Sequence, residues 1–372
     1  MSEFKFLVTM RDRYARVGTL TTPHGIISTP CFMPVGTNCS VKGISYQDLY
    51  SFNYPITLVN TYHILAKGAR QLIENAGGIH SFIGWKGSVL SDSGGYQMYS
   101  LVSLSKKSDQ GVIFVSPWDG SKILVSPESS LELQAEIGVD IAMCFDDCIS
   151  STASFEEHQL AVERSSLWAQ RCSSALHSKN YKKTTLFGII QGGQYLELRL
   201  QSLNRLLKIG FFGYALGGFA VGESRNQRNE ILSQICDHMP QNSPRYLMGV
   251  GTPVDILDAI SYGIDLFDCV LPTRNARNGY LFTSQGIVRI KNSKFQFDNT
   301  PLDKECCCVT CVNHTKSYLH YLFKHKQLTV YQLLTIHNLT YYSQLCIDAR
   351  SSIAKGCFEQ FRQKIFNVYV EK

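Results

Sequence analysis

Short apolar runs recur along the chain, and each ends in glycine or polar residues. Most of them lack the alternation of apolar and polar positions that marks a half-exposed strand, so they are typical of strands buried on both faces. Eight runs fit this description: residues 31–38, 56–63, 88–95, 140–148, 185–193, 213–218, 245–253 and 264–273. The stretches between them are mostly helical in pattern, for example 127–138, 154–177 and 225–239. Buried strands that alternate with helices predict a parallel α/β sheet covered on both faces.

Eight strand–helix units over about 240 residues favour a (β/α)8 barrel, whose usual size is roughly 250 residues. A doubly wound sheet would usually contain fewer strands. Two segments interrupt the repeat: the first thirty residues are predicted to form a hairpin-like piece, and residues 99–126 a β-ribbon inserted after the third strand. We therefore expect a catalytic barrel region over residues 1–290, followed over residues 291–372 by a second region whose terminal helices pack back on the barrel.

Composition narrows the class of protein. With 372 residues and 44% hydrophobic content the chain can bury a large core, and no stretch approaches the roughly 18–20 apolar residues of a membrane span. The first residues contain no apolar run like that of a signal peptide, and thirteen scattered cysteines indicate a reducing compartment. We expect a cytoplasmic protein with no membrane partner.

Positive charge is concentrated near the C-terminus. The formal net charge is +6, and the segment from Arg289 to the end holds 12 Lys and Arg against 6 Asp and Glu. The preceding residues are therefore neutral overall. A basic terminal segment is typical of a region that binds nucleic acid, with a solvated surface as the structural alternative.

The same basic segment contains a cluster of cysteines, "CCCVTC" at 306–311. In a reducing compartment such a cluster is more often a metal site than a set of disulfides. Cys308 and Cys311 form a C-x2-C pair, and zinc requires four nitrogen or sulfur ligands. Spacing alone leaves open whether Cys306 or Cys307 joins them and which histidine is the fourth ligand. The candidate histidines are His314, His320, His325 and His337, of which His337 lies in a helical segment.

Polar residues and glycines follow the ends of the predicted strands. In a (β/α)8 barrel the catalytic residues lie just past the carboxyl ends of the strands. The residues at these positions are Asn60, Asp92, Asp146, Asp147, Gln191, Gly217, Gly218, Gly249 and Asp268. Carboxylates, an amide and bare backbone should therefore converge on one end of the barrel.

Two of these carboxylates, Asp92 and Asp268, are suited to breaking a glycosidic bond, in which one acts as nucleophile and the other carries a proton. Asp92 precedes Gly94 and Gly95, whose lack of a side chain lets a planar ligand approach, and Tyr96 could stack on it. Ordinary turn or capping roles for the carboxylates are the structural alternative.

Another group of these residues could read the edge of guanine: the Asp146 carboxylate, the Gln191 amide and the Gly218 backbone. Sugar-binding sites use similar groups. After Asp268, Arg274 and Arg277 have the spacing of a clamp for phosphate or carboxylate.

Several strings together resemble one family, the bacterial tRNA-guanine transglycosylases. They are "SDSGGYQ" (91–97), "FDDC" (145–148), "IIQGG" (189–193), "LGGFAVGE" (216–223), "YLMGVGTP" (246–253) and "FDCVLPTRNARNG" (267–279), with "TPHGIISTPCFMPVGT" (22–37) and "NTYH" (60–63) earlier in the chain. The family's zinc pattern, C-x-C-x2-C-x25-H, is satisfied by Cys306, Cys308, Cys311 and His337. The resemblance spans nearly the whole chain.

The resemblance implies an irregular (β/α)8 TIM barrel with a zinc-binding subdomain after strand eight, and a homodimer. The implied reaction exchanges the wobble guanine of tRNAs with a GUN anticodon for a 7-deazaguanine base, in queuosine modification. Asp268 would be the nucleophile on the ribose, Asp92 the general acid/base, and zinc a structural ion.

Further site residues follow from the same resemblance. The base-binding positions are Ser93, Gly94, Gly95, Tyr96, Asp146, Gln191, Gly218 and Met248. The tRNA-contacting positions are Gly249, Val250, Gly251, Thr252, Pro253, Val254, Asp255, Thr273, Arg274, Asn275, Ala276 and Arg277.

The chain departs from the family pattern in two places. "NTYH" continues as "ILAKGAR" instead of an Arg-Pro-Gly turn, and Phe219 stands where bacterial relatives usually carry leucine, beside the pocket for the substituent on the incoming base. Cys148 and Val221 favour 7-aminomethyl-7-deazaguanine over the bulkier queuine. The alternatives for function are a barrel glycoside hydrolase, which leaves the basic segment unexplained, a non-catalytic tRNA-binding homologue, and metal-dependent hydrolysis, which needs an open coordination position.

Overall fold

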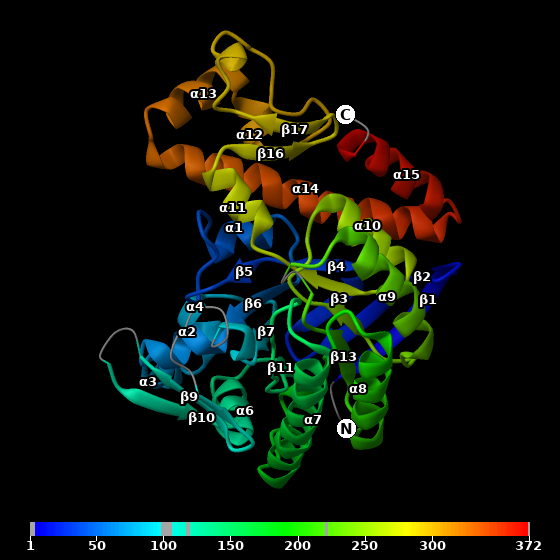
Figure 1. The fold of residues 1–372 in the computed structure, drawn as a ribbon. Helices are drawn as coiled ribbons and strands as arrows, with labels where there is room; N and C mark the ends of the chain where they lie inside the picture. The colour runs from blue at the N-terminus through cyan, green and yellow to red at the C-terminus, as the bar shows by residue number, and fades with distance from the viewer. Residues whose placement is uncertain (1–3, 98–105, 117–119, 220–221, 371–372) are drawn as a thin grey trace.

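The chain, seen in a computed structural model, is described over residues 4–97, 106–116, 120–219 and 222–370. Its centre is a parallel sheet with helices around it (Figure 1). The strands of this sheet are β4 (Cys31–Met33), β5 (Val35–Gly36), β6 (Ile56–Asn60), β7 (Ser88–Asp92), β11 (Ile141–Met143), β12 (Thr185–Ile190), β13 (Gly213–Leu216), β14 (Arg245–Leu247) and β15 (Leu266–Asp268). All eight predicted runs contain a strand of the sheet. Within the described residues no helix has both the length and the apolar character needed to cross a bilayer.

The sheet closes into a barrel through its first strand, which is split in two. The strand order is β4-β15-β14-β13-β12-β11-β7-β6-β5, and only Pro34 separates β4 from β5. Proline has no N–H to give to a ladder, but its carbonyl accepts a hydrogen bond from the Leu58 N–H at 3.0 Å. Both ends of the sheet therefore belong to one stretch of chain. The predicted (β/α)8 fold is confirmed.

Helices connect the strands around the outside of the barrel. They are α1 (Tyr46–Ser51), α2 (Thr61–Ala66), α3 (Arg70–Asn75), α4 (Ile79–Ile83), α6 (Pro127–Glu136), α7 (Phe155–Ser178), α8 (Leu196–Ile209), α9 (Arg225–His238), α10 (Pro253–Ser261) and α11 (Leu271–Arg277). Ser126, Ser154 and Ser224 cap α6, α7 and α9, each accepting a hydrogen bond from the third helical N–H. These caps explain why the three helices begin where the sequence pattern predicts.

A three-stranded antiparallel sheet lies at the amino end of the barrel strands. It consists of β1 (Lys5–Asp12), β2 (Ala15–Thr22) and β3 (Gly25–Thr29), one strand more than the predicted hairpin. Its Thr22 hydroxyl lies 2.7 Å from that of Ser88, the first residue of β7, and Arg16 Nε donates to Asp265 at 2.9 Å, just before β15. The chemistry predicted for the carboxyl ends of the strands is thus at the opposite end.

The predicted insertion after the third barrel strand is also antiparallel. It contains β8 (Lys106–Ser108), β9 (Gly111–Val115) and β10 (Lys122–Val125), in the order β10-β9-β8. The parts of the predicted ribbon at 99–105 and 117–119 lie outside the described residues.

One long helix connects the C-terminal region to the barrel. The elements after the barrel are β16 (Tyr280–Thr283), β17 (Gly286–Arg289), a 3-10 turn (Ser293–Phe295), α12 (Val309–Asn313), α13 (Lys316–Lys324), α14 (Leu328–Ala354) and α15 (Phe358–Tyr369). Helix α14 lies between the barrel and the β16–β17 hairpin (Figure 1). Tyr54 donates a hydrogen bond to the Leu339 carbonyl at 2.7 Å, and the Tyr342 ring packs on Phe32 with centroids 4.7 Å apart. The helix therefore completes the core on the side of β4. The division at residue 290 remains a prediction.

Candidate active site and metal centre

Asp92 ends β7 and lies buried at the carboxyl end of the barrel. Its carboxylate accepts hydrogen bonds from the Thr61 N–H at 2.9 Å, from Gln97 Nε2 at 2.6 Å and from Asn60 Nδ2. Burial nevertheless raises the pKa of Asp92 to about 6, and the nearby charge of Asp268 adds to this rise. A carboxyl group with such a pKa can gain and lose a proton near neutral pH. The segment "ILAKGAR" after Asn60 leaves the contact between Asn60 and Asp92 in place.

Asp268 ends β15 and is held through one oxygen atom. Oδ1 accepts hydrogen bonds from the Tyr246 hydroxyl at 2.6 Å and from the Gly249 N–H at 2.7 Å. In the described part of the chain no hydrogen bond reaches Oδ2. Burial raises the pKa of Asp268, while its two hydrogen bonds oppose the rise. The arrangement fixes the carboxylate and leaves one oxygen atom available to a ligand.

Asp146 follows β11 and connects the ends of three strands. Its Oδ1 accepts from the Ser93 hydroxyl at 2.9 Å, and its Oδ2 accepts from Gln191 Nε2 at 2.7 Å. Burial raises the pKa of Asp146 to about 6. Ser93, Asp146 and Gln191, which the sequence placed at separate strand ends, therefore form one hydrogen-bonded row.

Glycines let backbone pass close to this row. A Cβ on Gly95 would lie 2.5 Å from the Asp146 carbonyl oxygen, and a Cβ on Gly218 would lie 2.6 Å from Gln191 Oε1. Gly218 also has a φ of +67°, a conformation that side chains disfavour. Of the predicted stacking pair, Tyr96 is 46% exposed and Met248 packs partly buried against the barrel interior.

Arg199 on α8 supports this end of the barrel, and sequence reasoning missed it. It is fully buried and donates from Nε to the Gly193 carbonyl at 2.7 Å and from Nη1 to the Gly217 carbonyl at 3.1 Å. Its guanidinium lies 3.9 Å from the centroid of the Phe219 ring. Arg199 thus fixes both the loop after Gln191 and the Gly217–Gly218 turn. Its position inside an amphipathic helix gave no signal of this.

A second support is the buried carboxylate of Asp147, which the sequence placed at a strand end without its two partners. It pairs with Lys107 Nζ through Oδ1 and with Arg164 Nη1 through Oδ2, both at 2.5 Å. Lys107 belongs to β8 and Arg164 to α7. The inserted β-sheet and a barrel helix therefore both fix the loop that carries Asp146. The adjacent acidic residues of "FDDC" were the only sequence signal.

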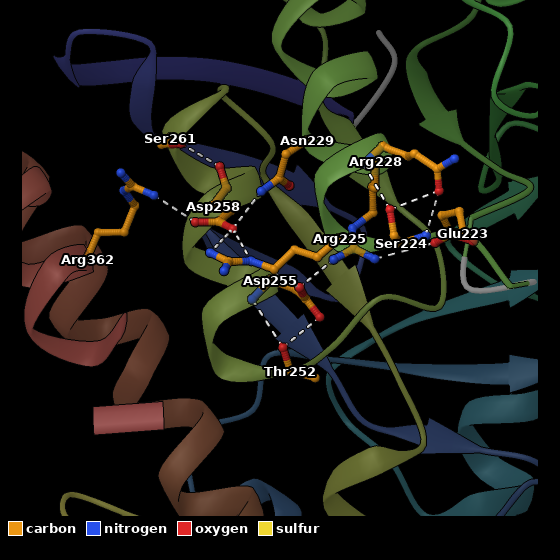
Figure 2. A network of polar contacts seen from close by, with 11 residues as sticks. Glu223, Ser224, Arg225, Arg228, Asn229, Thr252, Asp255, Asp258, Ser261 and Arg362 are labelled. Carbon is orange, nitrogen blue, oxygen red and sulfur yellow. Dashed lines mark hydrogen bonds and ion pairs between the residues drawn. The ribbon is translucent and has the colours of Figure 1, made fainter. Parts of the chain in front are cut away.

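The predicted tRNA-contacting loop at 249–255 is fixed by contacts within the protein. Thr252 caps α10, and Arg228 on α9 pairs with Asp255 (Figure 2). In the same figure the Asp258 carboxylate forms ion pairs with Arg225 at 2.5 Å and with Arg362 at 2.7 Å. These ion pairs link α9, α10 and α15. The loop is thereby held on a rigid base of three helices.

Exposure divides the predicted tRNA-contacting residues into two groups. The side chains of Val250, Val254, Thr273 and Ala276 are buried. Thr252 and Arg274 are exposed, whereas Asp255, Asn275 and Arg277 are half-buried. Only the second group can offer side chains to a partner without rearrangement.

The structure brings Cys306, Cys308, Cys311 and His337 together, with donor atoms within 4.8 Å of one another; we call them the Cys3His cluster. His337 Nδ1 lies 3.8 Å from Cys308 Sγ and 3.3 Å from Cys311 Sγ. Cys307 is exposed and points elsewhere, and His320 bonds the Ile290 carbonyl instead. The spacing left open which further cysteine and which histidine join Cys308 and Cys311, and the structure places Cys306 and His337 beside them.

The chemistry of the cluster suits a metal ion. His337 Nε2 lies 2.8 Å from the Phe282 carbonyl oxygen, so Nε2 carries the hydrogen and the lone pair of Nδ1 faces the three sulfur atoms. Three thiols and one imidazole are a donor set typical of structural zinc. The adjacent Asn338 donates to the Pro272 carbonyl at 2.9 Å, which connects the cluster to α11.

Comparison with known proteins identifies the family. A family model described as queuine tRNA-ribosyltransferase matches residues 12–371. The chain belongs to this family. Proteins named queuine tRNA-ribosyltransferase from Acinetobacter baumannii (strain SDF) and Acinetobacter baylyi are each 47% identical to it, over 95% and 93% of this chain and 93% and 90% of their own length. The one from Francisella tularensis subsp. novicida is 45% identical over 99% of this chain and all of its own length.

Membership of the queuine tRNA-ribosyltransferase family confirms the resemblance drawn from the sequence strings, and the predicted enzyme class with it. A barrel glycoside hydrolase is thereby set aside. The roles of individual site residues, the identity of the metal and the identity of the incoming base remain predictions.

Proposed function

We propose that the protein is a tRNA-guanine transglycosylase that replaces the wobble guanine of GUN-anticodon tRNAs with 7-aminomethyl-7-deazaguanine. The observation that carries the proposal is the pair of carboxylates at one end of the barrel, of which Asp92 is buried and Asp268 half-buried. Asp268 is held through Oδ1 alone, and Asp92 has a pKa near 6.

In the first half of the reaction, Oδ2 of Asp268 attacks the ribose anomeric carbon. The bond between this carbon and N9 of guanine breaks, its electron pair goes to N9, and Asp92 in its protonated form supplies the proton. In the second half, N9 of the incoming base gives its proton to Asp92 and attacks the anomeric carbon, which releases Asp268. Two displacements give net retention, as in retaining glycosidases.

The row of Ser93, Asp146 and Gln191 is proposed to read the edge of the base, together with the Gly218 backbone. An ionised Asp146 can accept hydrogen bonds from the ring N–H and the amino group of guanine, which few other bases offer together. Tyr96 and Met248 would lie on the two faces of the base. The base has to leave the anticodon stack to reach them.

The exposed residues Thr252 and Arg274 and the basic C-terminal segment are proposed to bind the anticodon stem-loop. Arg274 and the basic segment complement its phosphates in charge, and the Thr252 hydroxyl can form a hydrogen bond with it. Zinc in the Cys3His cluster would be structural, because four protein ligands leave no position open for water. The exposed apolar side chains of Val312, Tyr318 and Tyr321 support a homodimer, to be tested by sedimentation. A tRNA substrate also favours a cytoplasmic location.

Exchange of labelled guanine into unmodified GUN-anticodon tRNA tests the proposal. We expect exchange, and stronger competition by 7-aminomethyl-7-deazaguanine than by queuine, because Phe219 and Cys148 are buried beside the base-reading row. Well-folded protein that binds tRNA without exchange would favour the non-catalytic alternative.

Tyr246→Phe should lower the rate of covalent complex formation about tenfold, because the Tyr246 hydroxyl fixes Oδ1 of Asp268. The affinity for tRNA should not change. Single-turnover trapping of the complex measures the rate. Tyr214→Phe is the matched control, since Tyr214 is also buried on the neighbouring strand, and among the described residues its hydroxyl accepts a hydrogen bond from the Phe211 N–H alone. Equal effects of the two variants would exclude the positioning role of Tyr246.

The two half-reactions should depend on pH in opposite directions around the pKa of Asp92, about 6. Formation of the covalent complex requires protonated Asp92, so its rate should decline as the pH rises above about 6. Release of the complex by the incoming base requires ionised Asp92, so its rate should rise over the same range. Asp92→Asn should remove this opposition and leave only the dependence on ionisation of Asp146, whose pKa is also about 6 and which both steps share. Parallel profiles for the two steps would exclude Asp92 as the shared proton carrier.

A further inference from the structure

A second group of metal-ligating side chains lies at the amino end of the barrel, far from the carboxylates and from the Cys3His cluster. His24 lies in the turn between β2 and β3, His80 is on α4, and Asp140 directly precedes β11. One nitrogen of each histidine and the Asp140 carboxylate oxygens lie within 4.8 Å of one another. We call them the His2Asp cluster.

The donor atoms of the His2Asp cluster converge on one carboxylate. His24 Nδ1 lies 2.7 Å from Asp140 Oδ1, and His80 Nε2 lies 3.2 Å from Asp140 Oδ2. The two imidazole rings are stacked, with centroids 3.6 Å apart and planes inclined by 16°. The stacked pair thus presents one nitrogen of each ring to the same carboxylate.

The surroundings of Asp140 point to a cation. Its side chain is fully buried, yet among the described residues no lysine or arginine pairs with it. Besides the two histidines, the Val89 N–H donates to Oδ2 at 2.8 Å. A buried carboxylate without a lysine or arginine partner is costly, and a bound cation would compensate its charge.

The cluster is also rigid and accessible. Asp140 is held by its own N–H, which donates to the Val89 carbonyl at 2.9 Å, and the His24 turn is anchored by the contact of Thr22 with Ser88. The His24 side chain is 37% exposed and that of His80 15%. An ion can therefore enter from solvent, and water can complete its coordination.

We propose that His24, His80 and Asp140 bind a divalent transition-metal ion of the zinc type, as a second metal site. Two imidazoles and one carboxylate suit zinc, cobalt or nickel, whereas magnesium and calcium prefer oxygen ligands. Metal–ligand bonds of about 2.0–2.2 Å place tetrahedral donors roughly 3.3 Å apart. His80 and Asp140 are already at 3.2 Å, whereas His24, at 2.7 Å from Asp140, would move outward slightly to bind the ion. The ion fixes the β2–β3 turn to the amino end of the barrel. It takes no part in catalysis, because the reacting carboxylates lie at the other end of the strands.

Cobalt binding to the full-length, zinc-loaded protein tests the site, after weakly held metal has been removed with a mild chelator. We expect about one equivalent of Co2+ to bind, with the weak visible bands of nitrogen and oxygen ligands and without the intense thiolate-to-cobalt absorption that exchange into the Cys3His cluster would give. At a hundredfold excess over Kd, Co2+ should raise Tm by about 3–4 °C.

His24→Ala and His80→Ala should each abolish this equivalent and the rise in Tm, without change in guanine exchange. His325→Ala, which removes an exposed histidine on the C-terminal segment, should preserve the bound equivalent of Co2+ and the rise in Tm. Three results would overturn the proposal: no binding by the wild-type protein at millimolar Co2+, undiminished binding by His24→Ala and His80→Ala, or binding accompanied by thiolate absorption.

Discussion

Asp268→Asn should abolish the covalent complex with tRNA and lower the rate of base exchange by about 10⁴-fold or more. An amide is a far weaker nucleophile than a carboxylate, and no other carboxylate in the described residues ends a strand beside the Gly249 N–H. The shape of the side chain is retained, so Tyr246 and the Gly249 N–H can still bond its oxygen atom.

Denaturing gel electrophoresis of enzyme mixed with tRNA shows the covalent complex directly, and labelled-guanine exchange gives the rate. The affinity of Asp268→Asn for tRNA should remain near that of the wild type. Asp237→Asn, at an exposed position on α9, is the control for loss of a negative charge. A trapped complex in Asp268→Asn would show that a different group is the nucleophile.

Cys308→Ser should remove the metal ion of the Cys3His cluster and lower the free energy of unfolding by about 4–5 kcal/mol. Cys308 also caps α12, where its side chain accepts a hydrogen bond from the Cys311 N–H. Serine is a strong helix cap, so the substitution removes a metal ligand and keeps the helix end intact. The loss can therefore be assigned to the metal. Affinity for tRNA should fall as well, since the cluster is connected to α11 through Asn338.

Cys307→Ser is the matched control, because Cys307 is the exposed neighbour that lies outside the cluster. Zinc content by elemental analysis, Tm and tRNA affinity should be unchanged in this variant. If Cys308→Ser keeps its zinc and its affinity for tRNA, the proposal of a structural metal in the Cys3His cluster is wrong.

The barrel could be predicted because its strands are buried on both faces and therefore appear as continuous apolar runs. The ends of the individual strands were less predictable. The run at 264–273 contains only the three residues of β15, since the residues after Asp268 turn into α11. The division of the first strand at Pro34 was also not foreseen, although proline cannot donate to a ladder.

The site was predictable where a residue ends a strand or follows it closely. Asp92, Asp146, Gln191 and Asp268 could be placed at one end of the barrel from the order of the strands alone. Arg199 could not, because its role depends on which carbonyl groups of two distant loops meet around a guanidinium. The His2Asp cluster has the same origin: its members come from three segments that are distant in sequence and meet only in the folded protein.

The position of α14 has a consequence for how the protein is made. Phe32 and Tyr54, near the start of the chain, find their partners on a helix that begins only at Leu328, and β4 pairs with β15. Contacts so distant in sequence form late and slowly. During synthesis, the edge of β4 therefore stays unpaired and the apolar face around Phe32 and Tyr54 stays uncovered until almost the whole chain has been made. A chain that stalls before residue 328 should depend on chaperones to avoid aggregation.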